Sequence, residues 1–237
     1  MQISALWNRP LSQFHFRSRV ALAGALVLLA SFVGWQYYLD IQHQFLADKL
    51  RELCCSAEFQ RDVSTAGTSL PARLKRGWTR WNSRRIRDVT FRSPDPDKLV
   101  KAIQIVKQIG SLDSISSYET RISIHQVEDL LTGVRPSALY IPSEPLPRTR
   151  LPFLRNQTLQ WLCVARTQFS NPAIQDLPDS LTYFDATRTR INDAGLSGFT
   201  RLKRLKTLIL RRTPTTSAGI GRLQQQMPWC RISWEPL

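Results

Sequence analysis

The apolar residues of the chain recur in a comb that fits neither one long helix nor one long strand. The clearest copy is residues 181–196, LTYFDATRTRINDAGL, with its apolar positions at Leu181, Phe184, Ala186, Ile191 and Leu196. The close spacing at the start predicts a short strand and a turn, because alternate residues of a strand face the same side. The wider spacing at the end predicts a helix that returns along the other side.

This comb repeats along the second part of the chain. On the frame L-x-x-L-x-L-x-x-T-x-I, copies 22 to 26 residues apart start at Ile86, Leu112, Pro136, Leu159, Leu181 and Leu205. The fourth positions, which are the expected strand centres, are Val89, Ile115, Leu139, Leu162, Phe184 and Leu208. Each unit buries its apolar side against its neighbours, as in a solenoid. The sequence therefore predicts an α/β fold with one parallel sheet, outer helices or loops, and a closing strand at residues 230–233.

Two details refine the frame. Prolines interrupt the third unit at Pro142, Pro145, Pro147 and Pro152 and predict a bare loop in place of its helix. Threonines fill the ninth position at Thr120, Thr167, Thr189 and Thr213. We expect their hydroxyl groups to form a ladder that satisfies backbone groups where each strand turns away.

The last repeats, FDATRTRINDAGLSGFTRLKRLKTLILRRTPTTSAGIGRLQQQMPWCRI, resemble the leucine-rich repeats of bacterial proteins abundant in planctomycetes. Units of that family read L-x-x-L-x-L-x-x-T-x-I-T-D-A-G-L and close with a segment similar to L-x-x-x-x-P-x-C-x-I. The match extends over residues 159–232 and is weaker over residues 86–157. The resemblance implies a ribonuclease-inhibitor-like solenoid of about six repeats plus a C-terminal cap. Residues 16–53 also resemble the membrane anchor that precedes the repeats in many such proteins.

A charge-free run, VALAGALVLLASFVGWQYY, occupies residues 20–38. At about 1.5 Å per residue, a helix of this length crosses most of a bilayer core of roughly 30 Å. Aromatic side chains at its far end suit the head-group layer. We predict a transmembrane helix; a cleaved signal peptide is the alternative, although no A-x-A-like site follows the run. The expected organisation is a short N-terminal tail (1–19), the transmembrane helix (20–38), a stalk helix and basic, Trp-containing linker (39–85) and the repeat domain (86–237).

Leucines near heptad spacing at Leu39, Leu46, Leu50 and Leu53 predict that the helix continues as an amphipathic stalk. We expect it to pack on its own domain, with a coiled-coil dimer as the alternative. Residues 56–71 have no period and predict a loop. Arginines before the span favour a cytoplasmic N-terminus and an extracytoplasmic repeat domain. The basic residues between 73 and 85 argue for the reverse orientation.

The chain carries 33 Lys and Arg against 18 Asp and Glu, a formal net charge of +15. This excess attracts anionic partners, which include lipid head groups, anionic polymers, nucleic acid and acidic proteins. His15, His43 and His125 have no metal-ligand spacing, and no phosphate-binding loop is present. We therefore expect no enzymatic activity, no cofactor and no metal site.

The outward-facing positions of the repeats are the best candidates for function. We expect Tyr140, Trp161 and Tyr183 to form an aromatic stripe on the concave sheet, with Asp185 and Arg211 on the same surface. The alternative is that the stalk or the Trp78 segment covers them. The eighth positions carry Arg166, Arg188 and Arg212, which are either hydrated or hold an anion.

These observations predict a single-pass membrane protein that binds another protein through its concave sheet. One alternative is a structural, envelope-associated element that binds anionic lipid or polymer through its basic surface. A second alternative is a cytoplasmic nucleic-acid binder. It needs the inverted topology, and the sequence contains none of the known nucleic-acid-binding motifs.

Overall fold

The computed structural model describes residues 16–53, 55–59 and 86–237. The predicted tail up to residue 15 and the Trp-containing linker from residue 60 to 85 lie outside the described residues. The chain divides into two compact units, Met1–Gln42 and His43–Leu237.

Helix α1 (Phe16–Glu52) contains the whole charge-free run and the predicted stalk. Its described apolar side chains in the first unit are largely exposed, namely Leu26, Val27, Leu28, Leu29, Phe32, Trp35, Tyr37 and Tyr38. Within the described residues, the segment Gly24–Glu52 is the one helix long and apolar enough to cross a membrane. Length and composition alone do not distinguish such a helix from a signal sequence.

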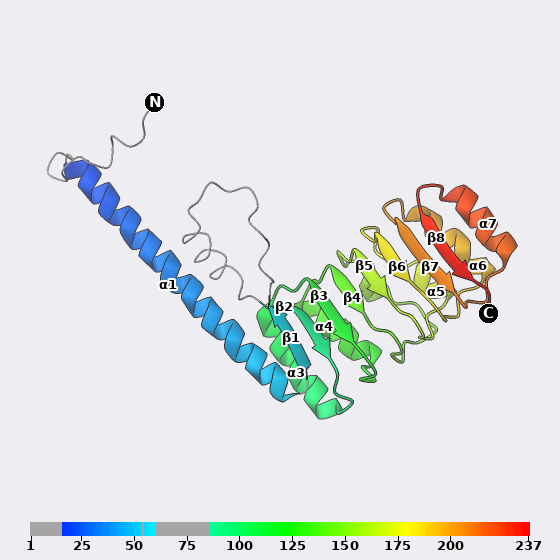
Figure 1. Cartoon of the computed structure of the whole chain (residues 1–237), viewed down its shortest axis with the longest axis horizontal. Helices are drawn as coiled ribbons and strands as arrows, with labels where there is room; N and C mark the ends of the chain where they lie inside the picture. Colours follow the sequence, from blue (N-terminus) through cyan, green and yellow to red (C-terminus); the bar gives the residue numbers. More distant parts are fainter. Residues whose placement is uncertain (1–15, 54, 60–85) are drawn as a thin grey trace. The chain divides into compact units, whose positions relative to one another are not determined.

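Eight strands form a single sheet in sequence order (Figure 1). They are β1 (Cys55–Phe59), β2 (Ile86–Phe91), β3 (Ser114–Ser117), β4 (Ala138–Tyr140), β5 (Trp161–Cys163), β6 (Tyr183–Asp185), β7 (Thr207–Arg211) and β8 (Arg231–Glu235). Strands β2 to β8 pair in parallel. The predicted centres lie in one row, in which Val89, Ile115, Leu139, Leu162, Phe184, Leu208 and Ile232 pair in turn. The predicted frame and sheet are therefore confirmed, and the closing strand extends two residues beyond its predicted end.

Strand β1 corrects the prediction of a loop from residue 56. It pairs antiparallel with β2, from Cys55 opposite Phe91 to Phe59 opposite Ile86. The compact unit that holds the sheet accordingly begins at His43, upstream of the boundary predicted at residue 86. The segment CSAEF lacks the comb because it belongs to no repeat; its pairing with β2 is what makes it a strand.

The end of α1 packs on the same unit, as predicted for the stalk. Leu50 is fully buried and Leu46 is nearly so, and both belong to the continuous apolar core of the repeats. Leu53 is partly buried against that core. This packing supports the expectation of a helix that lies on its own domain.

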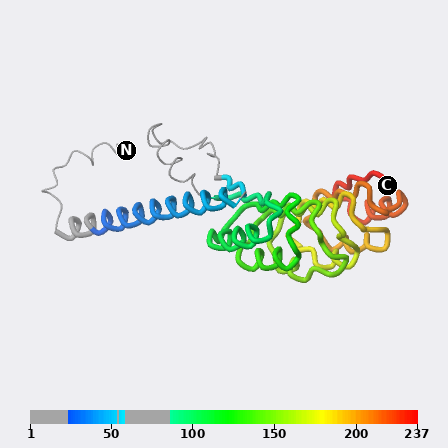
Figure 2. The backbone as a smooth tube through the Cα atoms, turned by 90° about the horizontal axis from the view of Figure 1, so that it is seen from below, coloured from blue at the N-terminus to red at the C-terminus, as the bar shows by residue number. Residues whose placement is uncertain are grey.

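Helices and turns return the chain along one side of the sheet; Figure 2 shows the coils of the first two repeats there. They are α3 (Pro96–Ile109), α4 (Ile124–Gly133), η3 (Pro152–Leu154), α5 (Asn171–Ile174), α6 (Asp193–Leu196), η4 (Ser197–Arg201) and α7 (Ser217–Gln226). Local sequence fixes their starts, because the Asp95 carboxylate caps α3 before Pro96 and Ser123 with Gln126 forms a capping box on α4. The side of the sheet away from these elements is called the open face below.

The proline-rich third repeat has no α-helix, as predicted, and contains only η3. Two buried carboxylates fix this loop instead. Glu144 accepts hydrogen bonds from Ser117 Oγ (2.9 Å), Thr120 N (3.1 Å), Thr120 Oγ1 (3.1 Å) and Ile122 N (3.1 Å). Asp176 accepts two hydrogen bonds from Arg150, at 2.6 and 3.1 Å, and one from Leu151 N at 2.9 Å. The Arg150 hydrogen bond is the main reason that the pKa of Asp176 lies below its ordinary value.

Hydrogen bonds from short polar side chains also connect successive repeats. Asp193 accepts hydrogen bonds from Thr216 N (2.8 Å) and Thr216 Oγ1 (2.6 Å) of the next repeat. The carboxylate fits there because Gly219 has no side chain in that space. Asn171 and Gly195 repeat the arrangement one unit earlier. The D-A-G part of the repeat pattern therefore has a packing role.

Candidate functional site

Two aromatic side chains stack on the open face. Trp161 and Tyr183 occupy the same position of β5 and β6 and pair directly across the parallel ladder. Their ring centroids are 4.7 Å apart and the ring planes differ by 19°. Trp161 nevertheless keeps 44% of its surface exposed. A large stacked aromatic surface is thus presented to solvent within the described part of the chain.

Tyr140 does not continue this stack. It pairs with Cys163, whereas Ala138 pairs with Trp161. The predicted stripe is therefore a stacked pair with Tyr140 in the adjacent row, next to Cys163 and Asp185. Tyr118, which the prediction did not single out, is 48% exposed. It stands in the seventh position of its repeat, so the frame itself identifies it as outward-facing.

Partial burial affects the ionisable side chains of both rows on the open face. Desolvation is the main cause that raises the pKa of Tyr140, of Tyr183 and of the Cys163 thiol above their ordinary values. A raised thiol pKa disfavours the nucleophilic thiolate. Tyr140 and Cys163 are therefore neutral near pH 7, and they lie with the Asp185 carboxylate in the row beside the aromatic pair.

The charged residues predicted on this surface have local partners. Asp185 Oδ1 accepts hydrogen bonds from Thr187 N (2.9 Å) and Thr187 Oγ1 (2.6 Å), which closes the turn after β6. Arg211 Nε donates to Ser233 Oγ at 3.0 Å. Asp185 therefore has a structural task in addition to any contact with a ligand.

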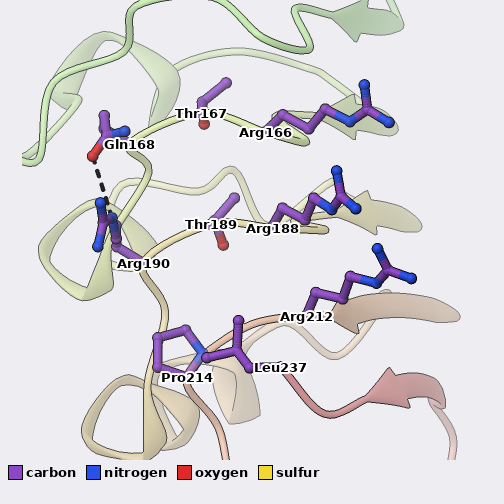
Figure 3. A pocket seen from close by; sticks show the side chains of 9 residues that line it. All are labelled: Arg166, Thr167, Gln168, Arg188, Thr189, Arg190, Arg212, Pro214 and Leu237. Atoms are coloured by element: carbon purple, nitrogen blue, oxygen red, sulfur yellow. Dashed lines mark hydrogen bonds between the residues drawn. The ribbon is translucent and has the colours of Figure 1, made fainter.

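The arginine column occupies an unusual backbone position. Arg166, Arg188 and Arg212 have positive φ angles of 60°, 56° and 52°. The eighth positions of the two preceding repeats, Glu119 and Ser143, share this left-handed conformation. Glycine and asparagine tolerate it best, which is why a pattern of arginines did not predict it. The side chains consequently leave successive turns in parallel (Figure 3).

The arginine column lines a pocket of about 360 Å³. Its other lining residues are Thr167, Gln168, Arg190, Thr189, Pro214 and Leu237. Gln168 Oε1 accepts a hydrogen bond from Arg190 Nε at 3.3 Å and another from Arg148 Nε at 3.2 Å. The sequence prediction missed Gln168 and Arg190, although both stand two residues after a column arginine.

The threonine ladder is confirmed as a structural element. The hydroxyl groups of Thr167, Thr189 and Thr213 donate to the carbonyl groups of Val164, Ala186 and Leu210, at 2.7, 2.8 and 2.9 Å. Thr120 donates to Glu144 instead. Glu144 occupies the ninth position of the third repeat, where the second, fourth, fifth and sixth repeats carry threonine. The sequence prediction missed it because a carboxylate does not fit the pattern of hydroxyl groups.

No protein-family model and no curated protein matches the chain. One solved structure that it resembles is that of a leucine-rich-repeat protein from Leptospira interrogans, at 19% sequence identity and a TM-score of 0.36. The match covers 55% of this chain, and the chain spans about a third (33%) of that protein. The repeat itself, a short parallel strand followed by a returning helix or turn every 22 to 26 residues, has leucine-rich-repeat-like character.

Proposed function

We propose that this protein is a membrane-anchored interaction protein that binds another protein through the open face of its sheet. The stacked pair of Trp161 and Tyr183 carries the proposal. Large aromatic side chains that are rigid and exposed are the commonest anchors of protein interfaces. Stacking on Tyr183 also holds the indole of Trp161 in place, which reduces the entropy that is lost when a partner binds.

The surroundings of the pair support a protein partner. Tyr118 adds a second exposed aromatic side chain on the open face, and the polar groups of Tyr140 and Cys163 lie in the neighbouring row. Aromatic side chains are enriched at the core of protein interfaces and polar side chains at the rim, and here Tyr140, Cys163 and Asp185 supply the polar groups. The described end of α1 packs against the apolar core of the repeats, with Leu50 buried there, and leaves Trp161 exposed.

The membrane anchor in this proposal is α1. Its apolar residues from Leu26 to Tyr38 are exposed around the helix, and such a surface is normally covered by lipid or protein. The arginines before the span favour an orientation in which the repeat domain lies outside the cytoplasm. Protease treatment of intact cells, followed with an antibody to the C-terminus, tests this: loss of the epitope is expected, and its full protection would contradict the orientation.

The interface is tested by photo-crosslinking in the native host. A benzophenone amino acid replaces Tyr183 in the full chain, or replaces Trp229 in the control. Trp229 serves as the control because it is an aromatic residue outside the open face: it lies in the turn before β8, packs on Lys203 and is 41% exposed, close to the 44% of Trp161. We expect a discrete protein adduct from position 183 that is absent from position 229.

The partner protein identified in the adduct is then purified, and its affinity for the full chain is measured by titration. Trp161→Ala should weaken its binding by about 2 kcal/mol, or roughly 30-fold, as an interface anchor does. Trp229→Ala should leave the affinity unchanged. Equal affinities for wild type and Trp161→Ala would show that the open face is not the interface.

A further inference from the structure

We propose that the arginine pocket is a binding site for a phosphoryl group that carries more than one negative charge. The pocket is lined by Arg166, Arg188, Arg212 and Arg190. This site is separate from the aromatic pair and does not depend on the proposed function. The proposal rests on four observations about the arginines: the lack of acidic partners, the left-handed backbone, the spacing between neighbouring strands and the common direction of the side chains.

The guanidinium groups have few acidic partners. Among the described residues, no hydrogen bond or ion pair involves the side chains of Arg166 and Arg188. Arg212 has one weak partner, Glu235, at 3.6 Å, and both side chains are about half exposed. The three column arginines are exposed, and their side chains extend side by side away from Gln168, Pro214 and Leu237 (Figure 3), so the column presents nearly its full positive charge to solvent.

Arginine at these positions carries two costs for the fold. A left-handed residue other than glycine costs about 1–2 kcal/mol. Like charges on neighbouring strands, about 4.8 Å apart, also repel each other. Glycine or asparagine would avoid both costs, so three successive arginines point to a function of the charges themselves.

The geometry selects the ligand class. Each guanidinium group presents a planar fork of N–H donors that matches two oxygens of a phosphoryl group. In Figure 3, the three column arginines point in the same direction, so neighbouring forks can contact one multiply charged group. Arg190 is oriented separately by Gln168 on the other side of the threonines. A pocket of about 360 Å³ accommodates a pyrophosphate or a phosphomonoester head group, and it is too open to select a monovalent ion by enclosure.

The test uses the full chain in a neutral detergent, titrated calorimetrically with pyrophosphate. We expect saturable binding at low salt that weakens as salt is added. Arg188→Gln, in the middle of the column, should lose about tenfold in affinity, and the triple change of Arg166, Arg188 and Arg212 to Gln should abolish saturable binding. Arg188→Lys keeps the charge without the fork and should lose part of the affinity.

A charge-matched control separates a site from general electrostatics. Arg204, Lys206 and Arg222 are exposed and do not line the pocket. Their triple change to Gln removes the same charge and should leave pyrophosphate binding nearly intact. An equal loss in both triple variants, or no saturable binding by the wild type, overturns the proposal. Circular dichroism of each variant confirms that the fold is retained.

Two further probes identify the source of the phosphoryl group. Short-chain phosphatidic acid that displaces pyrophosphate assigns the pocket to a lipid head group. Failure to displace it, with pyrophosphate still bound, assigns the pocket to a soluble phosphorylated compound. An oligo-glutamate peptide that binds where pyrophosphate does not overturns the phosphoryl assignment and points to an acidic protein segment.

Discussion

Asp193 occupies the space that Gly219 leaves free: a Cβ atom added to Gly219 would lie well inside van der Waals contact distance of the Asp193 carboxylate. The same carboxylate accepts hydrogen bonds from Thr216 N and Thr216 Oγ1 of the following repeat. The glycine and the acid of neighbouring repeats therefore form one joint. The later repeat provides both the space at Gly219 and the two hydrogen-bond donors of Thr216, and the earlier repeat provides the Asp193 carboxylate.

Gly219→Ala should destabilise the repeat unit by about 1–3 kcal/mol, because the added methyl group displaces Asp193 from its hydrogen bonds. Gly221→Ala in the same helix is the control, since nothing lies within 4 Å of a Cβ atom there. That change should stabilise the helix by about 0.5–1 kcal/mol. Urea unfolding followed by circular dichroism measures both. A Gly219→Ala variant as stable as Gly221→Ala would show that the joint adapts at no cost.

Glu144→Gln should destabilise the protein by about 1–3 kcal/mol. The buried carboxylate only accepts hydrogen bonds, and its Oε2 receives Ile122 N at 3.1 Å. In the glutamine variant, an amide nitrogen in the place of Oε2 would face the backbone N–H of Ile122, so that two hydrogen-bond donors would oppose each other. Unfolding midpoints measure the loss, and Glu128→Gln on the exposed side of α4 is the control, expected to be near neutral. Equal midpoints for the two variants would contradict the role of Glu144.

The Asp176 carboxylate should make stability depend on acid pH. Its folded-state pKa is lowered, chiefly by the hydrogen bond from Arg150, so it stabilises the fold above the ordinary aspartate pKa of roughly 3.9. This stabilisation is lost as the pH falls below that value and through the lower, folded-state pKa. Asp176→Asn should therefore be less stable than wild type at pH 6, and the difference should shrink below about pH 4. A difference that stays constant across this range would exclude the linkage.

Cysteine alkylation reports on the open face. Burial raises the pKa of Cys163, and raises that of Cys230 to about 11. The thiolate is the reactive form, so both thiols should react slowly near pH 7 and faster as the pH rises. Cys163 should react first, because Cys230 is 2% exposed. Mass spectrometry of iodoacetamide-treated protein gives the order. A bound partner at Trp161 should protect Cys163 alone, and simultaneous modification of both thiols would contradict the packing around Cys230.

Much of the fold follows from the apolar comb, because the same spacing of apolar residues recurs in each repeat and must be buried in the same way. Phe184, Leu208 and their counterparts lie where the frame puts them, since a one-residue slip would turn every apolar side chain outward. Strand β1 was not predictable in this way. Its five residues have no counterpart in any repeat, and their structure comes from long-range pairing with β2.

The candidate sites were predictable in composition and less so in geometry. The outward positions of Trp161 and Tyr183 follow from alternation along the strand, and so does the position of Tyr140 in a different row. The left-handed backbone of Arg188 does not follow, because arginine has no preference for that conformation. Gln168 and Arg190 meet Arg148 only through the stacking of three repeats, a relationship that no single repeat contains.

Strand β1 also bears on how the array changes in length during evolution. It runs antiparallel and occupies the edge of β2 that an additional parallel repeat would need. Tandem duplication or deletion of repeats can therefore take place only downstream of β2. The N-terminal end of the array is closed to such growth, so the number of repeats can vary while the attachment of the first repeat to α1 is inherited unchanged.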